Sequence, residues 1–351
     1  MSTKRFLLGV VLLMVGTSSV CAQGMTATLQ SGESLKAFYG VGAFLDAYAV
    51  ANDGDQITLS AGTFNSPTDA LTKSVKITGV GAFESTGNTV FSSLKVAAPN
   101  VRIEGVEISG YLNPSGSENI IVVRCWIGKL LAEENYTNPL FRECVIKEPS
   151  DLNYARGFTI MNCTIKAFSV GNNRDETNVG TIVNSTIYEW NVTTTSTNMY
   201  NRSITNSTDT APYAVYKNCV IGYKSYETYV INEFVTYISL NGYAPSEFYN
   251  NVIFDSGGYG ISVNFEGGCI NSGNKTTTAL GLSASGGIST NYFPAKQDNL
   301  MNGNDGTPVG IYGGIGFSKY PAIPRIMSTA IDGYTNDEGK INVKVEVTAG
   351  Q

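Results

Sequence analysis

The sequence predicts an all-β chain: a right-handed parallel β-helix, a solenoid of about ten coils with a cap at each end. Three observations support this fold. A Cys, Ser or Asn recurs at a period near 20, Asn directly precedes it in most copies, and a hydrophobic residue, usually Ile, follows two positions later. The recurring residues are Cys125, Cys144, Cys163, Ser185, Ser207, Cys219 and Asn251. The first spacings of 19, 19, 22 and 22 residues indicate one such residue per coil.

Strand alternation explains why this residue and the hydrophobic residue two positions later recur together. Side chains two positions apart in a strand point to the same face, so both are expected inside the coil. The hydrophobic residues are Ile127, Ile146, Ile165, Ile187, Ile221 and Ile253. A free Cys is small and apolar enough to stack in such an interior. We therefore expect a structural column of thiols. Metal binding is the alternative, although the chain has no CxxC and no His.

The Asn residues predict a sharp bend just before each inward-facing strand. Asn tolerates the left-handed backbone conformation, and its side chain can bond locally or to the Asn of the next coil. These residues are Asn162, Asn184, Asn206, Asn218 and Asn250.

Leucine-rich repeats are the competing solenoid. They need Leu at several fixed positions in each repeat, whereas these copies use Ile, Val, Thr and Phe. Coils from about Ile57 to about Ile270, stacked ~4.8 Å apart, would form a rod of ~50 Å.

Four segments follow along the chain. Residues 1–22 combine Lys4 and Arg5, an apolar run and "SSVCAQG", which is typical of a secretory signal cleaved after Ala22; a lipid anchor at Cys21 is the alternative. Residues 23–56 are expected to form an N-terminal cap with a short amphipathic helix in "GVGAFLDAYAVA". Its apolar positions are Phe44, Ala47, Val50 and Ala51.

Residues 57–300 form the predicted β-helix, and residues 301–351 the predicted C-terminal cap. In that cap, "DGTPVGIYGGIGFSKYPAIPRI" is expected to cross the last coil. "RIMSTAID" is then expected to pair as a strand with the alternating "KINVKVEVTAG".

Charge and composition limit the classes of partner. The net charge is −6, and no basic stripe is present that could neutralise nucleic-acid phosphates. No segment after the signal approaches the roughly 20 apolar residues of a membrane helix. We expect export to the periplasm, the cell surface or the medium, while the oligomeric state stays open.

"ANDGDQITLSAGTF" (51–64) resembles the first coil of many secreted β-helix proteins. With "DGTPVGIYGG", the closing alternating strand and "CAQG", the chain resembles exported, pectate-lyase-like β-helix proteins of Bacteroidetes. The resemblance implies secretion and the fold, and it implies no particular reaction. The motifs of the hydrolases on this fold are absent. "NSTD" is only partly similar to their Asn-Thr-Asp, and neither an Asp-Asp pair nor a His occurs.

A lyase needs less, namely a basic side chain to take a proton beside a uronate carboxylate and often Ca²⁺ to neutralise it. Lys147, Lys166 and Tyr188 each stand three residues after the recurring position, so we expect them side by side on one outer face. Lys147 or Lys166 would be the base with Arg174 nearby, and Asp175 and Glu176 would hold Ca²⁺; no other cofactor is implied. The alternative is that these residues have no catalytic role and lie on a solvated sheet face and in a solvent-exposed loop.

Aromatic residues suggest sugar contacts, because a ring offers an apolar face and Tyr adds a hydroxyl group. The candidates are Tyr188, Trp190, Tyr223 and Tyr226, the last two opening a Tyr-rich insertion at 223–251. The alternative for the insertion is packing against the flank of the rod. The sequence thus favours a non-enzymatic glycan-binding or surface protein. A Ca²⁺-assisted lyase of acidic polysaccharide and a purely structural rod remain the alternatives.

Overall fold

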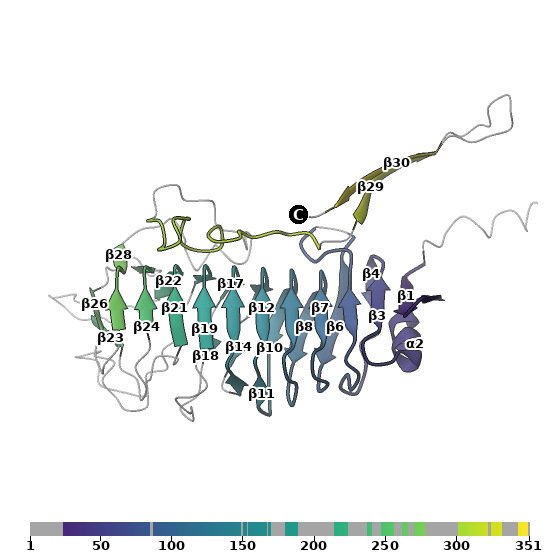
Figure 1. The fold of residues 1–351 in the computed structure, drawn as a ribbon, viewed down its shortest axis with the longest axis horizontal. Coiled ribbons are helices and arrows are strands. Elements are labelled where there is room, and N and C mark those ends of the chain that lie inside the picture. The colour runs from purple at the N-terminus through teal and green to yellow at the C-terminus, as the bar shows by residue number, and fades with distance from the viewer. Residues whose placement is uncertain are drawn as a thin grey trace, which may run out of the picture.

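The fold is a stack of parallel coils (Figure 1). The computed structural model describes residues 24–84, 87–148, 150–152, 154–166, 168–169, 180–188, 214–223, 237–240, 247–255, 262–265, 270–277, 301–321, 324–331 and 343–349. Two long sheets run the length of this stack, and nearly all their strand pairs are parallel. The predicted all-β parallel β-helix solenoid is confirmed.

The first sheet, sheet A, has 12 strands, of which the first two pair antiparallel at its N-terminal end. In spatial order they are β2 (Ser34–Tyr39), β1 (Thr26–Ser31), β3 (Gln56–Leu59), β5 (Lys76–Thr78), β7 (Arg102–Glu104), β9 (Ile121–Val123), β12 (Leu140–Arg142), β16 (Thr159–Met161), β19 (Gly180–Val183), β21 (Ala214–Lys217), β24 (Glu247–Tyr249) and β27 (Ile270–Ser272).

The second sheet, sheet B, has 10 parallel strands, one for each coil, in agreement with the expected number. They are β4 (Gly62–Phe64), β6 (Thr89–Lys95), β8 (Glu107–Asn113), β10 (Trp126–Leu130), β13 (Val145–Ile146), β17 (Thr164–Ile165), β20 (Thr186–Ile187), β22 (Val220–Tyr223), β25 (Val252–Asp255) and β28 (Lys275–Thr277). Three short parallel pairs lie outside the two sheets: β11 (Tyr136–Thr137) with β15 (Ala155–Arg156), β14 (Ser150–Asp151) with β18 (Phe168–Ser169), and β23 (Tyr237–Leu240) with β26 (Ser262–Phe265).

Each coil turns from sheet A into sheet B at a residue with positive φ. Asn162, Asn184, Asn218 and Asn250 occupy this position with φ between 46° and 54°, which confirms the predicted role of Asn. Earlier coils use other residues, and Arg124 and Glu143 adopt φ of 53° and 55°. We call the whole set the bend column: Gly105, Arg124, Glu143, Asn162, Asn184, Asn218, Asn250 and Gly273.

The spacing predicted a coil at Ser207, between those of Ser185 and Cys219. This prediction is wrong. Thr186 pairs directly with Val220, and Thr181 pairs directly with Val215. Residues 189–213 therefore form an insertion between two adjacent coils, and their own structure lies outside the described residues.

The predicted inner column is present, and hydrogen bonds run along it. Cys125, Cys144, Cys163 and Cys219 are buried free thiols. At several steps the backbone N–H of one coil donates to the side chain of the next. The pairs are Cys144 to Cys163 Sγ (3.4 Å), Cys163 to Ser185 Oγ (3.1 Å), Cys219 to Asn251 Oδ1 (2.8 Å) and Asn251 to Asn274 Oδ1 (2.8 Å). The column thus satisfies buried amides that the bend removes from the sheet.

The same burial predicts a loss of stability in alkaline solution. Burial raises the pKa of Cys125 and Cys144, and it raises the pKa of Cys219 from an ordinary value of 9.0 to about 12. Between these values the unfolded chain loses thiol protons that the folded chain keeps, so the unfolding free energy should fall by roughly 1.4 kcal/mol per pH unit for each thiol. Urea unfolding at pH 8 and pH 10.5 measures this slope. Cys219→Ala should make it shallower, and an identical slope in the variant would contradict the assignment.

The N-terminal end of the stack is covered by α2 (Ala43–Val50), the single helix of the described residues. Its Phe44 and Ala47 are fully buried, as expected, and the Phe44 ring lies 4.9 Å from that of Phe91. Val50 was expected on the same face but is 51% exposed. The antiparallel hairpin of β1 and β2 also belongs to this end, and the sequence did not indicate it. No helix in the described part of the chain is long and apolar enough to cross a membrane.

The C-terminal segment runs back along the stack instead of crossing the last coil. We call residues 301–321 the strap. Gly310 donates its N–H to the Asn218 carbonyl oxygen, Ser318 donates to Glu143, and Gly105 lies beside Pro321. The strap therefore follows the bend column toward the N-terminal end, as Figure 1 shows.

Beyond the strap, β29 (Pro324–Ile331) and β30 (Val343–Ala349) pair antiparallel, which confirms the predicted strand pair. Figure 1 places this pair beside the N-terminal half of the stack, away from the last coil. Its position follows from the direction of the strap.

Candidate functional site

The backbone places the three residues that were expected on one outer face in adjacent coils. Lys147, Lys166 and Tyr188 each donate their N–H to a carbonyl of the preceding coil, at 2.9, 3.0 and 2.9 Å. Both Lys side chains are half-buried, and Lys166 Nζ lies 3.8 Å from Glu148 Oε2. The predicted adjacency of the three residues therefore holds.

Tyr188 was expected to face a ligand, but its side chain is 1% exposed. Burial raises its pKa, and the nearby Tyr312 of the strap raises the pKa further. The returning strap covers this part of sheet B, so Tyr188 is packed beneath it instead of lying open. The remaining outer face begins at Lys166 and continues toward the N-terminal end.

Most of the other predicted site residues lie outside the described residues. These are Arg174, Asp175, Glu176, Trp190 and Tyr226. Tyr223 ends β22, but its side chain is not described. Among the described residues, no group of three Asp, Glu, Cys or His could hold a metal ion. The expected Ca²⁺ ligands stay a prediction.

Trp126 is the aromatic residue that the sequence reasoning missed. It is half-buried on the outside of β10, and Lys147 Nζ lies 5.5 Å from the centre of its ring. This distance is within the range of a cation–π contact. The signal was available, because Trp126 is one of two Trp residues in the chain and directly follows Cys125. A residue next to an inward-facing one in a strand must face outward.

A shallow pocket adjoins Trp126 on the same face. It has a volume of about 510 Å³ and is lined by residues of β4, β6 and β8 and the turn at Gly87. Glu107, one of the lining residues, pairs in register with Trp126 in the next coil. Asn88 Nδ2 donates to Glu107 Oε2 at 2.9 Å, which fixes both side chains at the rim. We call this continuous surface the Trp126 face: Asn88, Glu107, Trp126, Lys147 and Lys166.

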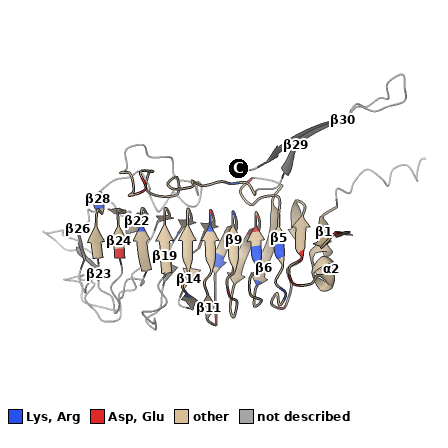
Figure 2. Cartoon of the chain, in the orientation of Figure 1, with Lys and Arg blue, Asp and Glu red and all other residues tan. Residues whose placement is uncertain are grey.

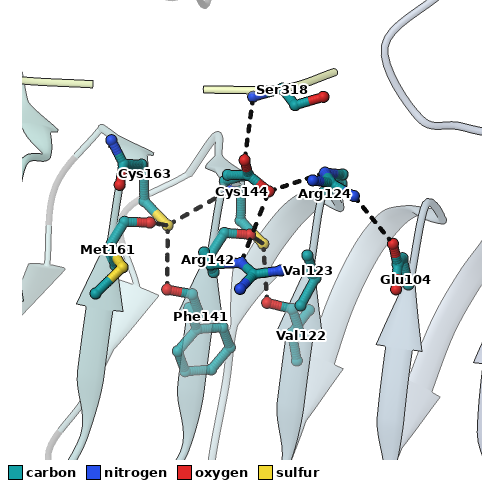
Figure 3. A network of polar contacts seen from close by, with 12 residues as sticks. Glu104, Val122, Val123, Arg124, Phe141, Arg142, Cys144, Met161, Cys163 and Ser318 are labelled. Carbon is teal, nitrogen blue, oxygen red and sulfur yellow. Dashed lines mark hydrogen bonds and ion pairs between the residues drawn. The ribbon is translucent and has the colours of Figure 1, made fainter. Parts of the chain in front are cut away.

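A second group of charges lies beneath the strap and is closed to solvent (Figure 3). Arg124 Nη1 lies 3.3 Å from Glu104 Oε1, and its Nε lies 2.8 Å from Glu143 Oε2. These three side chains are only 4–9% exposed. Ser318 of the strap donates its N–H to Glu143 Oε1 at 3.3 Å. A large substrate cannot reach this group, so its role is to hold the early bends and the strap together.

Comparison with known proteins adds no relative: no family model, no curated protein and no solved structure matches the chain. Function must therefore be inferred from the geometry of the Trp126 face.

Proposed function

We propose that the protein binds an acidic glycan along the Trp126 face. The observation that carries the proposal is the contact of Lys147 with the outward ring of Trp126, next to the pocket at Asn88 and Glu107. A flat ring can stack on the apolar face of a sugar, while amide and carboxylate groups bond to its hydroxyls. Lys147 and Lys166 would meet carboxylate or sulfate groups of the glycan.

The spacing of the coils also suits a chain-like ligand. Glu107, Trp126 and Lys166 stand on β8, β10 and just after β17, so the face spans several coils at ~4.8 Å each. This spacing is similar to the length of one sugar unit in an extended polysaccharide. A linear glycan lying along the rod could place successive units over successive coils.

Export is part of the same proposal. The N-terminal charge and apolar pattern and the resemblance to exported pectate-lyase-like β-helix proteins of Bacteroidetes both support it. An exported rod would meet polysaccharides in the periplasm, at the surface or in the medium.

Replacing Trp126 with Ala should weaken glycan binding about tenfold to hundredfold, because a central aromatic anchor often contributes ~2 kcal/mol or more. Isothermal titration against pectate, alginate and a neutral glucan measures the change. Tyr39→Ala is the matched control, since Tyr39 is 73% exposed on β2 and lies off the face. Equal weakening in both variants, or tighter binding of the neutral glucan than of the acidic ones, would contradict the proposal.

The same samples separate the alternatives. A lyase would generate the ultraviolet absorbance of an unsaturated product when Ca²⁺ is added, and this absorbance would depend on Lys147 or Lys166. A structural rod would give neither heat of binding nor absorbance.

A further inference from the structure

The outer surface of sheet A carries a charge pattern that is complementary to itself. One row of outward residues, one on each strand, runs along the sheet, and the strand register aligns its members from coil to coil. The row reads Lys76, Arg102, Ile121, Leu140, Thr159, Thr181, Val215, Glu247 and Ile270. Cations therefore stand at one end, an acid stands near the other, and the five residues between them are uncharged. Figure 2 shows the acidic residue on β24 and basic residues toward the opposite end.

The arrangement is symmetric about β16, the strand of Thr159. Arg102 lies on the third strand from β16 toward the N-terminal end, and Glu247 lies on the third strand toward the C-terminal end. A half-turn about an axis along β16 brings two copies of this sheet face to face with their rods antiparallel. In that arrangement Arg102 of each copy meets Glu247 of the other, and Thr159 meets Thr159.

The residues of this row are accessible. Arg102, Thr159 and Glu247 are half-buried and partly accessible, and Lys76 at the end of the row is exposed. Arg102 also pairs with Glu104 at 2.7 Å, and its side chain remains 30% exposed. An isologous interface needs one surface patch that is complementary to itself, which this row supplies.

The second outward row carries two further cations, and neither meets a like charge under the half-turn. Arg142 on β12 comes opposite Val183 on β19, and Lys217 on β21 comes over the position of Val123 on β9, whose side chain is buried. Lys217 Nζ lies 5.5 Å from the centre of the Tyr249 ring, so it already has a partner in its own chain.

We propose that sheet A is the interface of an antiparallel dimer of two copies of this chain, related by a two-fold axis at Thr159. Its strands cover a surface roughly 45 Å long and ~10 Å wide, so the two copies together bury ~900 Å², which is in the range of weak, transient interfaces. The dimer is therefore weak, and its population should grow with protein concentration. It is independent of the glycan face, because that face lies on sheet B.

Sedimentation equilibrium of the purified protein at about 1 to 200 µM tests this interface. The wild type should dimerise, and Glu247→Lys should weaken association at least tenfold, because it places a cation against Arg102 of the second copy. Arg102→Glu/Glu247→Lys restores opposite charges and should recover the dimer. Glu118→Lys is the matched control, since it makes the same charge change at an exposed residue outside sheet A.

A purely monomeric wild type at the highest concentration would overturn the proposal. Association that is equally strong in Glu247→Lys and Glu118→Lys would overturn it as well. Thr159→Glu supplies a second probe that leaves the Arg102–Glu104 pair intact, since it places two carboxylates at the axis. It should abolish the dimer, with circular dichroism confirming that the coils are folded, and a folded Thr159→Glu dimer would count against the two-fold axis.

Discussion

Replacing Arg124 with Asn is expected to lower the free energy of unfolding by about 3 kcal/mol, because it removes the cation that two buried carboxylates share. Glu104 keeps Arg102 at 2.7 Å, while Glu143 keeps only the more distant Arg142 at 3.7 Å. Glu104 and Glu143 lie 3.3 and 2.8 Å from the Arg124 guanidinium, and both are almost fully buried. Asn is the informative replacement, since the later coils use Asn at this position of the bend column and the positive φ is therefore retained. Urea unfolding at neutral pH measures the loss.

A double variant separates the charge effect from the backbone effect. Arg124→Asn/Glu143→Asn removes one carboxylate together with the cation and gives both coils the residue found in later coils. It should be more stable than Arg124→Asn alone. A loss below about 1 kcal/mol in the single variant, or a double variant whose loss equals the sum of the two single losses, would show that the three charges do not act as a unit.

Asn162→Ala is expected to cost about 3 kcal/mol and to release the strap. Asn162 Nδ2 donates to the carbonyl oxygens of Ile311 and Gly313 at 3.0 and 2.7 Å, and all three groups meet in a buried position. Each carbonyl that loses its donor costs ~1–3 kcal/mol, and Ala at a φ of 51° adds roughly 1 kcal/mol. Chemical unfolding measures the loss of stability. Limited proteolysis within residues 301–321 measures the release of the strap.

Asn162→Gly is the matched control, because Gly accepts the positive φ but cannot donate to the strap. It should be more stable than the Ala variant by about 1 kcal/mol while showing the same increase in cleavage of the strap. Wild-type resistance to proteolysis in both variants would mean that these two hydrogen bonds do not hold the segment.

The repeat made the fold predictable. A spacing of 19 residues between Cys125, Cys144 and Cys163 could be explained only by one position per coil, and the structure places these thiols in one column. The prediction for Ser207 was wrong because the inserted residues 189–213 carry the same "NST" that stands at Asn184. A short local motif does not distinguish a coil from an insertion between coils.

The strap could not be predicted, since its contacts depend on distant residues. Nothing in "DGTPVGIYGG" indicates that it will lie along Asn162 and Asn218, which stand more than 80 positions earlier. The candidate site shows the same limit. Alternation placed Lys147 and Lys166 correctly on the outside, but the burial of Tyr188 depends on the strap, which alternation does not reveal.

The return of the strap also fixes an order of folding. Its hydrogen bonds to Asn162 join residues 149 and 151 positions apart, so they form only after Ile311 and Gly313 have been synthesised, long after the coil of Asn162. Coils can stack one upon another from the N-terminus as they emerge, because each pairs mainly with its neighbour. The bend column beneath the strap then stays uncovered until residues 301–321 arrive. A chain truncated before residue 301 should therefore form coils and yet expose this column to aggregation, so the strap acts as a cover that is added after the coils have stacked.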